Sequence, residues 1–228
     1  MSNLGHVVSV NVGQPRLMEW LGQTEMTSIW KAPVAGRLAV RGVNIAGDDQ
    51  ADRKHHGGRD KAVYSYAVED AAWWADALGR PIEPGTFGEN LTLMGIDVTN
   101  ALIGERWEIG SAVFEVAQPR IPCWKLAARM GDASFPQQFG DAGRPGAYLR
   151  IIGEGDVAAG DEVRIVHRPA HELTVAGVAR IYHHDRDDYH LFLTVPELAE
   201  TWKRWARRRA GYNRWRSERA RQAAEPAQ

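Results

Sequence analysis

The stretch QPRIPCWKL, residues 118–126, contains the only cysteine of the 228-residue chain, Cys123. A thiol acts as a nucleophile or metal ligand in its thiolate form, which nearby positive charge favours. Arg120 and Lys125 can supply that charge, and the two prolines of the stretch restrict the backbone, so the loop should present the sulfur rigidly. Free cysteines are also among the residues most often buried in cores. These neighbours leave Cys123 open between an activated thiol and a structural residue.

A second stretch with chemical potential is DRKHHGGRDKAVYSY, residues 52–66. Its glycine pair would let backbone N–H groups approach an anion closely, which suits a phosphate or another oxyanion. It lacks the Gly-Lys-Ser/Thr ending of a Walker loop, and it is not a Rossmann fingerprint. A solvated basic turn remains the alternative. The cations of this stretch are Arg53, Lys54, Arg59 and Lys61.

Two histidine pairs raise the question of zinc. They are His55-His56 and His183-His184. Neither pair has the spaced Cys or His partners that a structural zinc site requires. We therefore do not expect either pair to bind a metal.

The stretch PGTFGENLTL, residues 84–93, places Gly85 and Gly88 just before Asn90 and an expected strand. Residues that tolerate positive φ belong in such a turn. The functional alternative is a loop whose backbone and Asn90 amide contact a polar ligand. This stretch by itself does not decide between the two.

The overall composition is that of a globular protein, with 44% apolar residues and a formal net charge of −1. A single cysteine excludes an intramolecular disulfide framework. Neither a signal peptide nor an apolar run of about 18 residues is visible, so we expect a cytoplasmic protein with no membrane partner. Residues 201–221 carry nine Lys or Arg against one acid, a local charge of +8. No nucleic-acid-binding motif accompanies this charge, so nucleic acid is not the expected partner.

The chain divides into two regions by the period of its apolar residues. Residues 1–168 predict many short strands with glycine-rich turns, which are typical of a β barrel, and helices at 67–81 and 124–131. Beyond this region, helical periods are predicted at 172–183, 187–193 and 196–210, with Pro196 in a first helical turn. We expect a mainly β fold with some α structure, in two domains at 1–168 and 169–228.

The motifs occur in an informative order: KHHGGRDKAVYSY, GTFGENLTL, GERWEIGSAVFEVAQPRIPCWKL, GRPGAYLRII and GDVAAGDEVRIV. Together they resemble the MOSC domain, named for the C-terminal domain of molybdenum cofactor sulfurases. The resemblance runs over about residues 30–167, and the helical tail is similar to that of the YiiM-type bacterial members. It implies a MOSC-type β barrel with a few short helices, followed by a small three-helix appendage.

The resemblance also implies a site for a molybdopterin-type molybdenum cofactor, with Cys123 binding the molybdenum. A thiolate is a suitable ligand for a metal already held by soft dithiolene sulfurs. Of the further candidates, His56, Asn90 and Arg120 lie inside the matching motifs. The candidates for the phosphate and the polar pterin edges are Arg53, Lys54, His56, Gly57, Asn90, Arg120 and Arg150.

The activity implied by the family is reduction of small N-hydroxylated compounds, such as hydroxylamino purines and amidoximes, to amines. The chain has neither the cysteine set of an iron–sulfur cluster nor a GxGxxG flavin motif, so we expect an external electron-donor reductase as partner. The basic tail could dock an acidic redox partner. Residues 1–29 are too short for the extra N-terminal domain of larger members, which leaves the substrate range open. The alternative is a cofactor or sulfur carrier that uses Cys123 as a ligand or persulfide without turnover.

Overall fold

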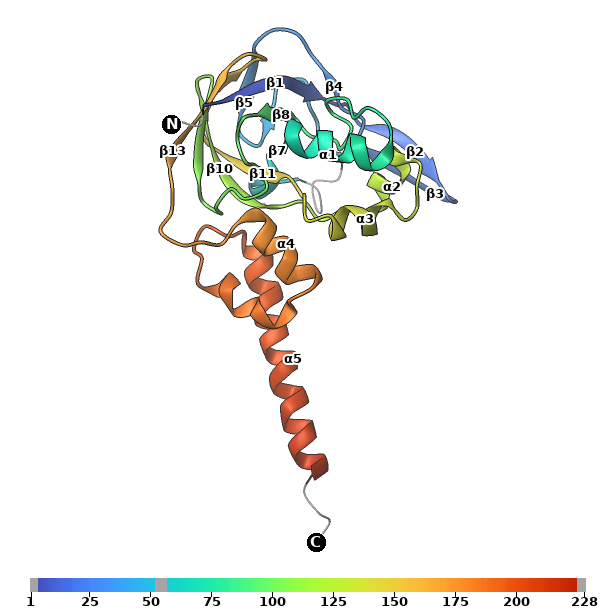
Figure 1. Ribbon diagram of the computed structural model, residues 1–228, viewed down its shortest axis with the longest axis vertical. Helices are drawn as coiled ribbons and strands as arrows, with labels where there is room; N and C mark the ends of the chain where they lie inside the picture. The colour runs from blue at the N-terminus through green and yellow to red at the C-terminus, as the bar shows by residue number, and fades with distance from the viewer. Residues whose placement is uncertain (1–3, 52–56, 225–228) are drawn as a thin grey trace.

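The computed structural model describes residues 4–51 and 57–224. Its centre is a closed barrel of seven strands, β1 (Gly5–Val12), β7 (Val63–Ala67), β8 (Leu91–Met94), β9 (Arg106–Ile109), β10 (Ala112–Pro119), β11 (Ala147–Gly153) and β13 (Glu162–His167). The strand order is β13-β9-β10-β11-β7-β8-β1, and pairing of β1 with β13 closes the barrel. All neighbours are antiparallel except β7 and β8. The predicted barrel is confirmed (Figure 1).

The parallel pair β7 and β8 is joined through the helix α1 (Val68–Leu78), which lies outside the barrel. Successive residues of β7 face opposite sides, as in any strand. Val63 and Ala67 belong to the core cluster of the barrel, whereas Tyr64 and Tyr66 belong to a second, aromatic cluster. Because both faces are apolar, β7 shows no alternation in the sequence, and the sequence patterns did not predict it as a strand.

The aromatic cluster fills the space between β7 and three short helices, α1, α2 (Trp124–Met130) and α3 (Phe135–Asp141). The ring of Trp74 stacks on Phe139 at 5.7 Å, and its Nε1 donates a hydrogen bond of 2.9 Å to the hydroxyl of Tyr66. The predicted helices at 67–81 and 124–131 correspond to α1 and α2. Gly79 ends α1 in the left-handed conformation, at φ 62°. The sequence patterns did not predict α3.

The remaining strands form short pairings at the edge of the barrel. A hairpin of two strands has an exposed tip, and a separate three-stranded sheet contacts β10. These elements are β2 (Arg16–Trp20), β3 (Gln23–Thr27), β4 (Ala32–Pro33), β5 (Leu38–Arg41), β6 (Asn44–Ile45), the 3-10 turn η1 (Arg59–Lys61) and β12 (Gly155–Val157).

The C-terminal region has three helical elements, α4 (Val175–His183), the 3-10 helix η2 (Arg186–Leu193) and α5 (Glu200–Ala224). The prediction that the last helix occupies 196–210 was wrong at both ends. Pro196 lies in the turn before α5, and α5 continues past 210 through the basic segment, where its end extends alone from the body (Figure 1). Lys and Arg are good helix formers, so a basic segment without apolar periodicity can remain helical. Within residues 4–51 and 57–224, no helix combines the length and apolarity needed to span a bilayer.

The C-terminal helices do not pack as a separate core. Val178 and Ile181 of α4, together with Phe192 and Trp202, belong to the same apolar cluster as the barrel interior. The domain boundary at 168/169 stays a prediction, and this shared cluster argues that the two regions unfold together.

Replacing Phe192 tests that cooperativity. Its side chain is fully buried between Trp202 and Trp205, at ring distances of 5.7 and 5.6 Å. We expect Phe192→Ala to lower the free energy of unfolding by about 3–5 kcal/mol in a single urea transition, followed by circular dichroism. Exposed Leu193→Ala is the control, with an expected change below about 0.5 kcal/mol. Two separate transitions would instead indicate independent domains.

Candidate functional site

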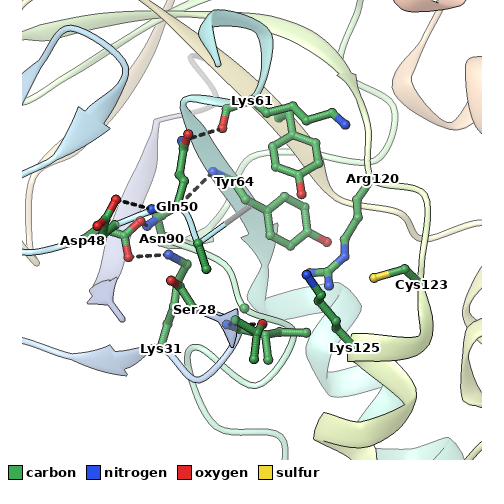
Figure 2. Close-up of a pocket in the computed structure, with 16 residues that line it drawn as sticks. Ser28, Lys31, Asp48, Gln50, Lys61, Tyr64, Asn90, Arg120, Cys123 and Lys125 are labelled. Carbon is green, nitrogen blue, oxygen red and sulfur yellow. Dashed lines mark hydrogen bonds and ion pairs between the residues drawn. The ribbon is translucent and has the colours of Figure 1, made fainter. Parts of the chain in front are cut away.

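A pocket opens beside Cys123, and its described walls come from six separate segments of the chain. They are the end of β3 with the residues after it, the loop before residue 52, η1 with β7, the turn before β8, the β10–α2 connection and β11. We call this cavity the Cys123 pocket (Figure 2). Its charged lining residues are Lys31, Lys61, Arg120, Lys125, Asp48 and Asp49.

Cys123 is held between a strand and a helix. Pro119 is the last residue of β10 and pairs with Ala147 of β11, and Cys123 directly precedes α2. The carbonyl of Cys123 accepts the first helical hydrogen bond, at 2.9 Å from the amide of Leu126. The side chain is partly exposed, and its sulfur points into the pocket towards Arg120 (Figure 2). The sulfur is thus presented to the pocket by this connection, and the rigidity of the loop stays a prediction.

Arg120 places a permanent positive charge next to that sulfur. Its guanidinium is buried, donates a hydrogen bond to the carbonyl of Phe87, and lies over the ring of Tyr64 at 5.1 Å. Burial acts to lower the pKa of Arg120, but the charges of Tyr148, Tyr64 and Cys123 outweigh it, so the pKa is raised. The residue therefore stays protonated and keeps a positive charge on the side of the pocket towards which the sulfur points.

Three lysines add to the positive lining. Lys125 forms an ion pair of 3.1 Å with Glu25, and Lys61 lies 5.9 Å from the ring centre of Tyr148. Lys31 pairs with buried Asp48, and burial is the main cause that lowers the pKa of Lys31. Among its described lining residues, the pocket thus presents four cations, two carboxylates and one thiol, which suits an anionic ligand.

Asn90 belongs to the pocket, but its amide is used by the protein itself. Its Oδ1 accepts from the amide of Tyr64 at 3.1 Å, and its Nδ2 donates to Asp48 at 2.9 Å and to the carbonyl of Asn11 at 3.2 Å. Asp48 also accepts from the amide of Gly13 at 2.8 Å. Asn90 and Asp48 therefore join β1, β7 and the loop before residue 52 into one wall of the site.

The turn before Asn90 is built around a buried carboxylate. Glu89 accepts from the amides of Gly85 at 2.6 Å and Phe87 at 3.1 Å, and burial raises its pKa. Gly85 and Gly88 have positive φ, 82° and 76°, as their positions predicted. A Cβ on Gly88 would lie only 2.9 Å from Cγ1 of Ile29. This turn fixes the Phe87 carbonyl that holds Arg120.

Not every predicted residue lines the pocket. Arg150 is buried elsewhere, with its guanidinium paired to Asp60 at 2.5 Å and to Glu115 at 2.9 Å. Gly57 is described but is not part of the lining. Arg53, Lys54 and His56 lie outside the described residues. The pocket therefore brings together Cys123, Arg120 and Asn90 from the predicted set.

The sequence did not single out several lining residues as site candidates. Tyr64 and Tyr148 stood inside the matching motifs, and their place in those blocks was the available signal. Lys61 was named only as one cation of the 52–66 stretch. Lys31 and Asp48 had no local signal, because only the fold brings them to the pocket.

A pH titration of stability tests the burial of the site's tyrosines. Burial is the main cause that raises the pKa of Tyr64 and Tyr148. Such groups keep their protons when the unfolded chain has lost them, so their stabilising contribution is complete below about pH 10 and is lost above it. Above about pH 10, we expect the free energy of unfolding to fall with pH less steeply in Tyr64→Phe than in the original protein. The two slopes, measured by urea unfolding, should differ by up to about 1.4 kcal/mol per pH unit.

Tyr212→Phe, at a half-exposed position, is the matched control for that titration. It should keep the steeper fall of the original protein. The same slope in Tyr64→Phe and in the original protein would contradict the assignment.

The chain is similar to known proteins in sequence and in fold. The MOSC domain family model matches residues 52–164. An uncharacterized protein of Bacillus subtilis (strain 168), YflK, is 35% identical over 200 residues, covering 86% of this chain and 90% of YflK. The protein YiiM of Escherichia coli (strain K12) is 32% identical over 189 residues, covering 80% of this chain and 84% of YiiM.

The chain is also similar to a solved structure and to a protein named as a reductase. The crystal structure of YiiM from Geobacillus stearothermophilus matches with a TM-score of 0.75 and 31% identity, covering 90% of this chain and 98% of that one. A protein of Gibberella moniliformis (strain M3125 / FGSC 7600) named as a reductase is 29% identical over 167 residues, 71% of this chain but 29% of its own length. With its closed barrel, its ordered motifs and these relatives, the chain belongs to the MOSC domain family, as a YiiM-type member.

Proposed function

We propose that this chain is a molybdenum-cofactor-dependent oxidoreductase that reduces N-hydroxylated compounds to amines. The observation that carries the proposal is that the sulfur of Cys123 points into a pocket whose described lining includes four cations. A soft thiolate within a positive lining suits a metal that arrives on an anionic, sulfur-bearing cofactor.

The donor set of the pocket fits such a cofactor. Among the described residues, no group of three or more His, Cys, Asp or Glu side chains gathers as a metal cluster. Cys123 would therefore be a single protein ligand, and the pterin dithiolene would supply the other sulfurs. The free volume of the pocket is about 80 Å³, room for a phosphate-sized part of the cofactor. The described walls would thus hold one end of it.

The roles of the lining residues follow from their contacts. Arg120, fixed by the Phe87 carbonyl, would stabilise the thiolate of Cys123 and a nearby anionic group. Lys61 and Lys125 would add positive charge at the pocket wall. Asn90 would act indirectly, by holding Asp48 and β7 in place. Roles for Arg53, Lys54, His56 and Gly57 at the cofactor phosphate remain predictions, and Arg150 would act through Asp60 of η1.

The reaction breaks the N–O bond of the substrate and replaces it with an N–H bond. It consumes two electrons and two protons and releases water. When bound, the molybdenum cofactor supplies the two-electron redox chemistry. The electrons would come from an external reductase, because the chain has neither a flavin motif nor the cysteines of an iron–sulfur cluster. The family membership and the fungal relative named as a reductase support this class of reaction.

Replacing the thiol tests the proposal. The protein is expressed in a host that makes the molybdenum cofactor, beside Cys123→Ser, and molybdenum per chain is measured. We expect the serine variant to retain at least about tenfold less molybdenum and to lose turnover of benzamidoxime with a chemical reductant, since a hydroxyl is a poor ligand for a soft site.

Two outcomes would count against the proposal. Equal molybdenum in both proteins, with matched circular dichroism spectra, would refute the ligand role of Cys123. Molybdenum bound by the original protein without any turnover would instead indicate a cofactor or sulfur carrier.

A further inference from the structure

A second cavity lies between the Cys123 segment and the C-terminal helices. Its volume is about 360 Å³, within the range of about 300–1,000 Å³ typical of small-molecule sites. It shares Lys61, Cys123 and Tyr148 as walls with the Cys123 pocket. We call it the helix-side cavity. The thiol is thus flanked by two cavities of different composition.

The far wall of the helix-side cavity is aromatic. Tyr182 of α4 and Trp205 of α5 both line it, with ring centres 5.5 Å apart. Trp202 packs edge-on against Tyr182 at 5.3 Å, and its Nε1 donates a hydrogen bond of 2.7 Å to Gln118 of β10. The aromatic wall is therefore fixed to the strand that leads to Cys123.

The charge of the helix-side cavity is positive. Lys61 lines it on the barrel side and Arg208 on the helix side, whereas no carboxylate belongs to its described lining. Arg208 lies three residues after Trp205 on α5, and residues three apart share a helix face. A ligand in contact with the Trp205 ring would therefore have this guanidinium within reach.

We propose that the helix-side cavity is the substrate site, and that it takes planar aromatic N-hydroxylated compounds bearing an anionic group. The inference rests on the proposed function, which supplies the N-hydroxylated class. Aromatic rings stack on Trp and Tyr side chains, and a positive rim without carboxylates favours an anion over a cation. The wall shared with the Cys123 pocket brings the reacting end of such a compound next to the thiol.

Three amidoximes separate ring from charge. Benzamidoxime is aromatic and neutral, para-carboxybenzamidoxime is aromatic and anionic, and acetamidoxime is neither. We expect Trp205→Leu to raise KM for both aromatic compounds about five- to tenfold, with little effect on acetamidoxime. Arg208→Gln should raise KM about three- to fivefold for the carboxylated compound alone. The control is Arg204→Gln, which removes the same charge from α5 outside the cavity lining.

Two measurements without turnover keep this inference distinct from the proposed function. Molybdenum per chain should be equal in all four proteins, and a loss in Trp205→Leu would overturn the inference, because the cavity would then hold the cofactor itself. Calorimetric titration of para-carboxybenzamidoxime without reductant should give weaker binding in both cavity variants. If the cavity variants bind this compound more weakly but the original protein shows no turnover, the result would support the helix-side cavity as a binding site and refute the proposed reduction. KM and Kd values within twofold of the original protein in both cavity variants would overturn the cavity assignment.

Discussion

The buried guanidinium of Arg120 is the interaction on which the candidate site depends. Burial of a charge costs several kcal/mol unless partners compensate for it. The partners are the carbonyl of Phe87, the ring face of Tyr64 and the sulfur of Cys123. Each comes from a different segment, so satisfying this one cation brings three segments together. The result is a fixed positive charge beside the thiol.

A shell of buried polar groups keeps those partners in place. Glu89 holds the turn that presents the Phe87 carbonyl, and Asn90 fixes the backbone of Tyr64 while it bonds Asp48. Such networks are stable only when every member is satisfied, because unpaired buried polar groups are costly. A rigid site follows, in which the protein uses its own side chains to position the few that remain open to a ligand.

The C-terminal helices connect to the same strand that carries the thiol. Gln118 of β10 lies five residues before Cys123. Its side chain donates a hydrogen bond to the carbonyl of Asp60 at 2.8 Å and accepts one from Trp202 of α5. Because α4, η2 and α5 share the apolar core of the barrel, their aromatic wall has a fixed position relative to the sulfur. A helical appendage attached by a flexible linker could not form the second cavity in this way.

The sequence alone predicted many local features: the barrel strands with alternating apolar residues, the helices that correspond to α1 and α2, and the motif order that identifies the family. The cofactor-binding roles of Cys123, Asn90 and Arg120 stay predictions. The sequence did not predict β7, because a strand buried on both faces has no alternation, nor the extent of α5. Arg150 matched a motif, yet the fold pairs it with Asp60 and Glu115 away from the pocket lining. Only the tertiary structure placed Lys31, Asp48 and Trp205 in the two cavities that Cys123 also lines, because their contacts join residues far apart in the chain, and the local sequence does not specify such pairings.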